Sequence, residues 1–378
     1  MRELRNKTIL LISPQSWGTM FVSKHHYAIE LAKMENRVYF LNPPDNKNEK
    51  SKDRVRISSS GVENLWLINH RLWFPYNLKF HAIFLFHLFI KPHIKKILKE
   101  VSRPIDFVWS FDLGNLYPLR FFGVLPFKIF HPVDEPLNKT AIDSAKGCDI
   151  IFSVTREILE KYSWVKAPKY FINHGVAGDF ITSVNSIRLS NRRVHIGFSG
   201  NLLRNDIDRS VLLQIVRENP EVFFDFFGSY TESHSNIGGI QDSEVDQFVS
   251  FLQGSQNVKL HGPVKHQTLA CEFQRMDAFL ICYDIKKDQS GGTNYHKIME
   301  YLSTGKVIIS NNVTTYKSEP DLLRMVESRE DNKDLPTLFK DTIRQIGLFN
   351  SPSLQDKRVK FALENTYSRQ VERIEKLI

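Results

Sequence analysis

Short apolar runs, rich in β-branched and aromatic residues, alternate along the chain with longer amphipathic stretches, and this alternation restarts near the middle. Such alternation is typical of parallel α/β sheets, whose strands are buried on both faces. The expected strands are TILLIS, RVYFLN, NLWLIN, DFVWS, FKIFH, DIIFSV and KYFIN in the first half, and VHIGFSG, VFFDFFG, NVKLHG, AFLICY and KVIIS in the second. A chain of 378 residues also exceeds what one hydrophobic core usually supports. We therefore predict an α/β protein with two Rossmann-like, doubly wound parallel sheets in tandem.

The domain boundary is expected in the polar segment of residues 178–193, which separates the two sets of strands. We therefore predict an N-terminal Rossmann-like domain over residues 1–180 and a C-terminal one over residues 190–356. Apolar residues recur at roughly helical spacing in residues 357–378, so this tail is expected to form one or two amphipathic helices. Further helices are expected over residues 23–34, 143–148 and 208–219.

The chain is basic, with a formal net charge of +9 and a pI near 9.2. Basic proteins of this kind bind nucleic acids, anionic membranes or phosphorylated ligands. No basic arm is interleaved with aromatic residues on one element, so we do not expect a nucleic-acid partner. Three scattered cysteines, Cys148, Cys271 and Cys282, predict buried thiols in a reducing compartment rather than disulfides or a metal cluster.

The N-terminus carries basic residues before an apolar run that is shorter than the roughly 7–15 apolar residues of a signal peptide. No segment reaches the roughly 18–20 continuous apolar residues of a membrane span. We therefore expect a cytoplasmic protein.

A small, glycine-containing loop, FSGNLLRNDID, follows the first expected strand of the second half. Free backbone amides near Gly200 and Asn201 suit a phosphate group, and Arg204 could add a charge-assisted contact. The second and third glycines of a dinucleotide-binding fingerprint are missing. An ordinary strand-to-helix turn that needs a glycine remains the alternative.

A second loop follows the strand AFLICY, whose last residue is Tyr283. Residues 288–294 lack apolar side chains and lead into a helix that is expected to end near Leu302. Thr293 is the expected N-cap, with Asn294 as the alternative. The amides near Gly291 and Gly292 would then be free for a ligand.

Lys297 and Glu300 lie three residues apart and would share a face of this helix. Lys297 near the loop amides would suit a diphosphate, and Glu300 could accept hydrogen bonds from the two hydroxyls of a ribose. This arrangement would hold a nucleoside diphosphate without a metal ion. The alternative is a surface Lys–Glu pair that adds a few tenths of a kcal/mol to helix stability.

Polar residues also follow the expected strands of the first half. His131 is the best candidate to hydrogen-bond a reacting hydroxyl, and Asp134 could serve as a general base. In open α/β sheets, ligands gather beyond the carboxyl ends of the strands, so these loops are expected to face a cleft between the two sheets. The other residues expected there are Trp17, Gly18, His25, His26 and His174. No metal-ligand spacing, GxSxG elbow or P-loop is present.

Several segments together resemble a known family. The matching segments are Trp17-Gly18, His25-His26 with Leu31-Ala32, CDIIFSVT, NHGV, IGFSGNL, KIMEYLSTGKVIIS and the tail NTYSRQVERIEKLI. Over nearly the whole chain, this combination resembles the GT-B fold glycosyltransferases of the large retaining group (glycosyl transferases group 1, family-four type). It is most similar to the enzymes of capsule and teichuronic-acid biosynthesis.

The resemblance implies a nucleoside-diphosphate sugar as donor and a glycan or lipid-linked acceptor, with no cofactor. It assigns Lys297 to the phosphates of the donor and Glu300 to its ribose. It also implies that the C-terminal helix returns to the N-terminal, acceptor-binding domain. Many members carry a second, sugar-binding glutamate where this chain has Gly292. We therefore expect the amides of residues 291–293 to hold the donor sugar instead, assisted by Asp284 or Asp288. A GT-B sugar-nucleotide epimerase and a non-catalytic sugar-nucleotide or glycan-binding protein remain alternatives.

The stretch from Arg71 to Glu100 combines aromatic residues with four lysines, Lys91, Lys95, Lys96 and Lys99. A basic, aromatic amphipathic helix of this kind can lie on an anionic bilayer, which predicts a peripheral position on the inner face of the plasma membrane. The alternative is a helical hairpin that covers the N-terminal sheet, with its lysines in water.

Overall fold

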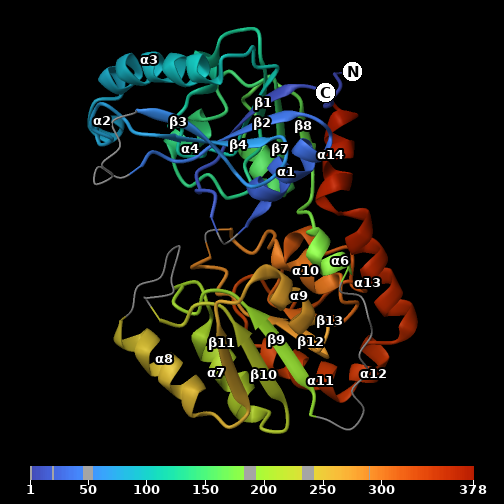
Figure 1. Ribbon diagram of the computed structural model, residues 1–378. Helices are drawn as coiled ribbons and strands as arrows, with labels where there is room; N and C mark the ends of the chain where they lie inside the picture. The colour runs from blue at the N-terminus through green and yellow to red at the C-terminus, as the bar shows by residue number, and fades with distance from the viewer. Residues whose placement is uncertain (1, 19–20, 46–53, 183–192, 232–241, 289) are drawn as a thin grey trace. The chain divides into compact units, whose positions relative to one another are not determined.

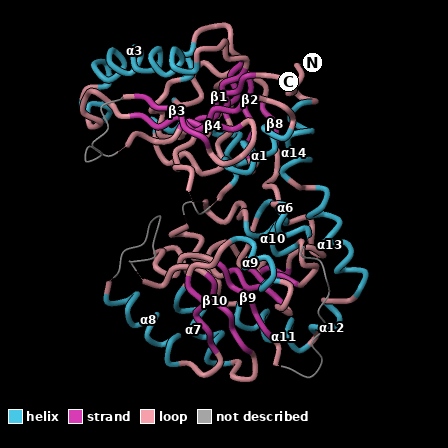
Figure 2. The backbone as a smooth tube through the Cα atoms, viewed as in Figure 1, coloured by secondary structure: helices cyan, strands magenta, loops and turns pink. Residues whose placement is uncertain are grey.

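The computed structural model describes residues 2–18, 21–45, 54–182, 193–231, 242–288 and 290–378. The chain forms two compact units, Met1–Asn173 with Tyr367–Ile378, and His174–Thr366. Each unit contains one sheet that helices cover on its faces (Figures 1 and 2). The predicted pair of α/β sheets is therefore confirmed.

The sheet of the first unit has eight strands in the order β3-β4-β2-β1-β5-β6-β7-β8. All neighbouring strands are parallel except β3, which is antiparallel to β4. The strands are β1 (Thr8–Ile12), β2 (Arg37–Leu41), β3 (Val55–Ser59), β4 (Leu65–His70), β5 (Phe107–Ser110), β6 (Phe127–Phe130), β7 (Ile150–Ser153) and β8 (Lys169–Phe171). The central strands are buried along almost their whole length, which explains their apolar sequences.

Helices of very different length accompany this sheet. They are α1 (Ser23–Lys33), α2 (Leu78–His81), α3 (Ile83–Val101), η1 (Leu119–Phe122), α4 (Lys139–Asp143), α5 (Arg156–Lys161) and α14 (Tyr367–Glu375). The helix expected over residues 143–148 is wrong, because α4 ends at Asp143 and Gly147 has a φ of +87°. C-terminal helix α14 packs against α1, where the ring of Tyr367 stacks on His26 with centroids 4.7 Å apart.

The sheet of the second unit has six parallel strands in the order β11-β10-β9-β12-β13-β14. The strands are β9 (His195–Ser199), β10 (Phe223–Phe227), β11 (Val258–Gly262), β12 (Ala278–Ile281), β13 (Val307–Ser310) and β14 (Arg324–Met325). The helices are α6 (Gly178–Thr182), α7 (Arg209–Glu218), α8 (Ser243–Gly254), α9 (His266–Phe273), α10 (Lys297–Leu302), η3 (Thr314–Tyr316), α11 (Leu335–Arg344), α12 (Ile346–Phe349) and α13 (Pro352–Glu364).

The boundaries between the two units differ from those expected from the sequence. Residues 174–182 belong to the second unit, because α6 packs on α9 there. The expected C-terminal tail is split as well: α13 belongs to the second unit and α14 to the first. Helix α13 stays in the second unit because the guanidinium of buried Arg358 donates hydrogen bonds to the carbonyl groups of Gly305, Asp321 and Phe349.

All three cysteines are free thiols, but the expectation that all are buried is wrong, since Cys271 is exposed and Cys148 half-buried. Across the part of the chain that the structure describes, no helix combines the length and the apolar character that crossing a membrane requires.

Candidate functional site

The carboxyl ends of β9 and β12 meet the start of α10 in the second unit, and Lys297 lies at this junction. Its side chain is 7% exposed, and its ammonium group donates hydrogen bonds to the carbonyl oxygen of Ser199 and the hydroxyl of Tyr283. The ammonium also lies 4.9 Å from the ring centroid of Tyr283. Burial lowers the pKa of Lys297. A buried cation at the carboxyl end of a parallel sheet is a suitable partner for an anionic ligand.

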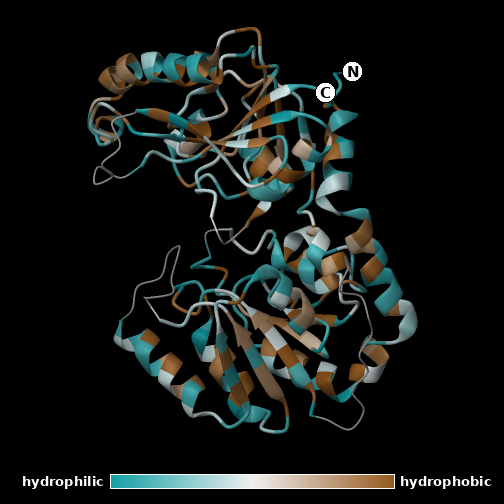
Figure 3. Ribbon diagram, viewed as in Figure 1, coloured by the Kyte–Doolittle hydropathy of each residue, from teal (hydrophilic) through white to brown (hydrophobic). Residues whose placement is uncertain are grey.

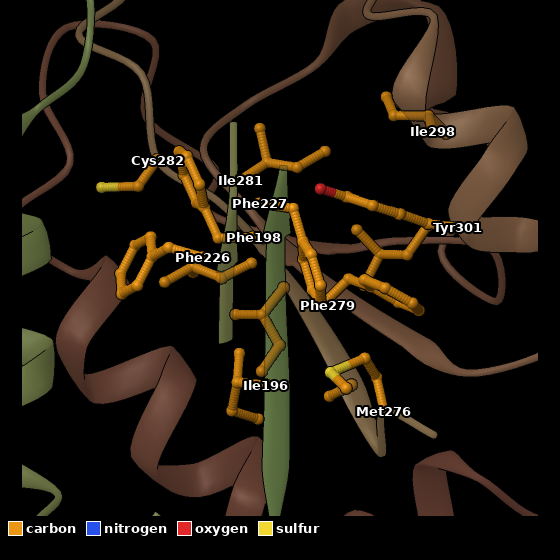
Figure 4. Packing of buried hydrophobic residues seen from close by; sticks show 14 of the residues in the cluster. Ile196, Phe198, Phe226, Phe227, Met276, Phe279, Ile281, Cys282, Ile298 and Tyr301 are labelled. Atoms are coloured by element: carbon orange, nitrogen blue, oxygen red, sulfur yellow. The ribbon is translucent and has the colours of Figure 1, made fainter. Parts of the chain in front are cut away.

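Helix α10 is held at this place by Tyr301. The ring of Tyr301 stacks on Phe279 of β12 with centroids 4.1 Å apart, and Figure 4 shows the two side chains against the apolar core around β9. The Tyr301 hydroxyl accepts a hydrogen bond from the backbone amide of Ser199 at 2.8 Å. Because the same hydroxyl also contacts the Ser199 side chain at 2.9 Å, α10 is tied directly to the end of β9.

Gly200 leaves the space that this junction needs. A Cβ atom on Gly200 would lie 3.1 Å from both the ammonium nitrogen of Lys297 and the hydroxyl oxygen of Tyr283. The loops after β9 and β12 are also joined by backbone bonds, since Ile207 and Tyr283 form a β-bridge and the amide of Asp284 donates to the carbonyl of Asp206. The predicted residues Gly200, Tyr283 and Lys297 are therefore neighbours in the structure.

Arg204 stands in the same loop but is already paired. Its Nε donates to the two carboxylate oxygens of Asp206 at 2.9 and 3.0 Å, and Asp206 itself is 2% exposed. Hydrogen bonding to Asp206 raises the pKa of Arg204. Asn201 accepts a hydrogen bond from the amide of Leu203 at 3.0 Å and shapes the turn between them. Part of the positive charge expected from Arg204 is thus compensated within the loop.

The loop before α10 is organised around the carboxylate of Asp288, which is 8% exposed. Its Oδ2 accepts hydrogen bonds from the hydroxyl of Tyr295 and that of Ser290, both at 2.6 Å, and from the amide of Gly292 at 3.1 Å. Its Oδ1 accepts a fourth hydrogen bond, from the backbone amide of Ser290 at 3.0 Å. A carboxylate that accepts four hydrogen bonds from its own loop stabilises that loop. The expected assistance of Asp288 at a bound sugar is therefore not supported by its geometry.

The predicted N-cap at Thr293 is wrong, because α10 begins at Lys297. The carbonyl of Thr293 accepts hydrogen bonds from the amide and the hydroxyl of Thr315, at 3.2 and 2.6 Å, which holds this residue in the loop. Asn294, the next residue, is 6% exposed. Earlier in the loop, the carbonyl of Gly291 accepts a hydrogen bond from the guanidinium of Arg329 at 2.6 Å. The amides near Gly291 and Gly292, which we expected at the N-terminus of the helix, therefore belong to the loop that precedes it.

Gly292 has a backbone conformation that disfavours any side chain. Its φ is +69°, and a Cβ atom would lie 2.8 Å from the backbone carbonyl oxygen of Asn312. A glutamate at this position would need another loop conformation.

Glu300 contacts a residue that the sequence did not single out. His266 at the start of α9 brings its Nε2 to 3.8 Å from the Glu300 carboxylate and its Nδ1 to 3.2 Å from that of Asp179 in α6. Burial lowers the pKa of His266, but the two carboxylates outweigh this and raise it above its ordinary value. Lys297 and Glu300, three residues apart, thus contact different elements.

In the first unit, the side chain of His131 is completely buried. Its side chain is 0% exposed and lies among the rings of Tyr27, Phe111 and Phe152. Its Nδ1 accepts a hydrogen bond from the Trp109 indole at 3.3 Å, and burial lowers its pKa to about 3. A contact of this ring with a reacting hydroxyl therefore conflicts with its burial among aromatic side chains.

The other residues predicted from the first half lie in different surroundings. Asp134 is 71% exposed, with a carboxylate oxygen 3.6 Å from the ammonium of buried Lys24. Trp17 packs on Phe40 and is half-buried, next to exposed Gly18. His26 faces α14 through Tyr367, as described above. His174 belongs to the second unit, with its ring 6.3 Å from that of His296.

Several residues of the site were missed from the sequence. Asn311 is fully buried, accepts a hydrogen bond from the amide of Tyr283 at 3.0 Å and donates to the Tyr295 hydroxyl at 3.4 Å. It follows β13 directly, so the rule that ligands gather beyond strand ends applies to it as well. His266 and Arg329 carry no such signal. Within the described residues, no three His, Cys, Asp or Glu side chains gather in a way that could hold a metal ion.

No family model matches the chain, and no curated protein matches it either. The finer resemblance to capsule and teichuronic-acid enzymes therefore stays a prediction. Solved structures do match along nearly the whole chain. Sucrose-phosphate synthase from Thermosynechococcus elongatus is 13% identical, with 98% of both chains covered and a TM-score of 0.68.

Two further structures match over a similar length. HepE from Anabaena, solved with UDP and glucose, is 11% identical, with 98% of this chain and 100% of that chain covered and a TM-score of 0.66. An α,α-trehalose-phosphate synthase (UDP-forming) from Burkholderia xenovorans, solved with glucose-6-phosphate, is 11% identical, with 98% and 99% covered and a TM-score of 0.68. At these identities the likeness concerns the fold, and it confirms the predicted GT-B fold with its two Rossmann-like sheets.

Proposed function

We propose that the chain is a glycosyltransferase that moves a sugar from a nucleoside-diphosphate donor to a glycan or lipid-linked acceptor in surface polysaccharide biosynthesis. The observation that carries this proposal is the buried ammonium of Lys297 beside the backbone of Ser199 and Gly200, where a diphosphate would need a cation. The names of the matching structures support it: they include a sucrose-phosphate synthase, a UDP-forming trehalose-phosphate synthase and a protein solved with UDP and glucose.

The proposed chemistry depends on charge at the leaving group. When the bond between the sugar and the diphosphate breaks, negative charge develops on the departing phosphate oxygen. A fixed cation such as Lys297 stabilises this charge because it needs no reorganisation during the step. Arg204 contributes less, since Asp206 compensates part of its charge. With cations in this role, we propose a reaction that needs no metal ion and that retains the configuration of the sugar.

Glu300 is proposed to accept hydrogen bonds from the ribose hydroxyls of the donor. Its contact with His266 supports this, because a carboxylate that faces a protonated imidazole stays ionised and able to accept hydrogen bonds. On the acceptor side, Asp134 stays the proposed base, since it is exposed. His131 stays a proposed contact of the sugar, but its ring is buried, so this contact requires the surrounding aromatic side chains to move. Trp17, Gly18, His26 and His174 stay proposed contacts of the acceptor or the sugar.

The test is to incubate the full chain with UDP-, GDP-, CDP- and dTDP-sugars, with and without glycan or lipid-phosphate acceptors. Free nucleoside diphosphate is quantified by chromatography and the remaining sugar nucleotide by NMR. Acceptor-dependent release of a nucleoside diphosphate is the expected result. An epimerised sugar nucleotide without such release would instead identify an epimerase. Donor binding with neither product would identify a non-catalytic binding protein.

A further inference from the structure

Large apolar side chains gather on the outside of the first unit around α2 and α3. Of the 14 large hydrophobic residues exposed in the described part of the chain, seven lie within residues 73–88. They are Trp73, Tyr76, Phe80, Ile83, Phe84, Leu85 and Leu88, with exposed fractions between 42% and 77%. Single exposed apolar residues are ordinary, but half of them within one short segment marks an interaction surface. We refer to these seven residues as the apolar face.

Neighbouring side chains of the first unit hold three rings of the apolar face in position. The ammonium of buried Lys79 lies 5.5 Å from the ring centroids of both Tyr76 and Phe80. The ring of Trp73 packs against Phe89 with centroids 4.8 Å apart, yet 44% of Trp73 stays exposed. The apolar face is therefore a fixed part of the fold.

Helix α3 continues this face with positive charge. Its buried side carries Phe86, Ile90, Ile94 and Ile97, while Phe84, Leu88, Lys91, Lys95 and Lys99 are all exposed. The latter five are spaced by three or four residues and form one ridge along the helix. The ridge starts apolar next to α2 and becomes basic at Lys91. The ribbon of α3 in Figure 3 accordingly shows teal bands among the brown ones, which mark the buried side of the helix.

The charge of residues 71–101 indicates which kind of partner the apolar face binds. Glu100 is the one acidic residue from Arg71 to Val101, while Lys91, Lys95, Lys96 and Lys99 are exposed on α3. A second copy of the same face would offer these lysines little acidic charge in return, which disfavours self-association. An anionic lipid surface offers both required components, an apolar layer for the aromatic side chains and phosphate groups for the lysines.

We propose that the apolar face and the lysine ridge of α3 dock the chain on an anionic phospholipid bilayer. Since no described helix can cross a membrane, α3 would lie in the plane of the interface, with Phe80 and Phe84 among the acyl chains and the lysines at the lipid phosphates. Docking of this kind would bring the chain to a lipid-linked acceptor, so the inference extends the proposed function. Its test is independent of that function, because vesicle binding is measured without any substrate.

The test is flotation of the full chain with vesicles of phosphatidylcholine alone and with vesicles that also contain phosphatidylglycerol. At low salt the protein floats with the anionic vesicles, and high salt weakens this binding because it screens the lysines. The double variant Lys95→Ala/Lys99→Ala binds about 30-fold more weakly. The matched pair Lys333→Ala/Lys340→Ala, exposed lysines of the second unit, leaves binding unchanged.

The apolar part has its own variant, Phe84→Ser/Leu88→Ser, which weakens vesicle binding at least about tenfold. Leu137→Ser removes an apolar side chain that is 61% exposed elsewhere in the first unit and leaves binding unchanged. Circular dichroism confirms that each variant is folded. The proposal is overturned if the wild type stays unbound at low salt, or if both double variants float like the wild type. It is also overturned if light scattering shows a dimer that Phe84→Ser/Leu88→Ser dissociates, since the face would then be a contact between copies.

Discussion

The position that a Cβ atom would take on Gly292 lies 2.8 Å from the carbonyl oxygen of Asn312. The residue that the resemblance expects here, a glutamate, therefore does not fit the loop as it is folded. Glycine at this position suits the observed loop conformation. Asp288 stabilises that conformation, because its carboxylate accepts a hydrogen bond from the amide of Gly292.

Alanine substitutions at the two neighbouring glycines separate backbone strain from this collision. Gly291 and Gly292 both have positive φ values, +58° and +69°, but a Cβ atom on Gly291 meets nothing within 4 Å. We expect Gly291→Ala to lower the free energy of unfolding by about 1–2 kcal/mol, and Gly292→Ala to lower it by more. Urea denaturation measures both. Equal losses in the two variants would contradict the collision.

Asp288 is expected to stabilise the loop rather than bind a ligand. Asp288→Asn removes the charge from a buried carboxylate that accepts four hydrogen bonds, so we expect it to lower the free energy of unfolding by about 1–3 kcal/mol. Asp284→Asn is the control, because that carboxylate is 28% exposed and accepts a bond from the amide of Lys286 at the surface. Thermal unfolding compares them. A loss for Asp284→Asn as large as for Asp288→Asn would argue against this role.

The contact of His266 with Glu300 predicts a pH dependence of stability. The folded pKa of His266 is raised above 6.5 by the carboxylates of Glu300 and Asp179, despite burial. A raised folded pKa stabilises the protein fully below pH 6.5, and this contribution is lost as pH rises through the folded pKa. His266→Gln should therefore destabilise most near pH 6 and least near pH 9, measured by urea denaturation. A difference that grows with pH would refute the contact.

The buried pair His70 and His93 predicts the opposite dependence. Burial lowers the pKa of His70 to about 3 and that of His93 to about 4, from 6.5. A lowered folded pKa stabilises the protein above pH 6.5, and this contribution is lost as pH falls from 6.5 toward those values. Between pH 6.5 and about 4, His93→Gln should reduce the slope of unfolding free energy against pH by at most about 1.4 kcal/mol per unit.

Gln suits this position because it can donate or accept the bond that His93 Nε2 shares with His70 Nδ1 at 2.9 Å. His81→Gln, at an exposed histidine of α2, is the matched control and should leave the slope unchanged. Acid titrations followed by circular dichroism and urea denaturation give both slopes. An unchanged slope in His93→Gln would show that this pair does not resist protonation.

The sheets could be predicted from the sequence because their buried strands are apolar runs. Strand β3 was missed, since four of its five residues are exposed and it carries no such run. The start of α10 was misplaced for another reason: Thr293 is bound to Thr315, 22 residues away, and local capping rules do not register such contacts.

The candidate site could be predicted from the sequence only in part. The strand-end rule led to Gly200 and Tyr283. Helical spacing singled out Lys297 and Glu300, and the resemblance then favoured a donor-binding role for this pair over a surface ion pair. The burial of His131 was not predictable, because Trp109, Phe111 and Phe152 surround it from neighbouring strands and loops. Asp288 and His266 act through side-chain contacts that no single-sequence pattern indicates.

The central claim is that Lys297 binds the diphosphate of the donor, and isothermal titration with UDP, GDP, CDP and dTDP tests it most directly. We expect the wild type to bind at least one of these, and Lys297→Met to bind it at least about tenfold more weakly, because a charge-assisted hydrogen bond is lost. Lys340→Met, at an exposed lysine of α11, should bind like the wild type. Equal affinities of the wild type and Lys297→Met, or no binding of any of the four by the wild type, would contradict the account.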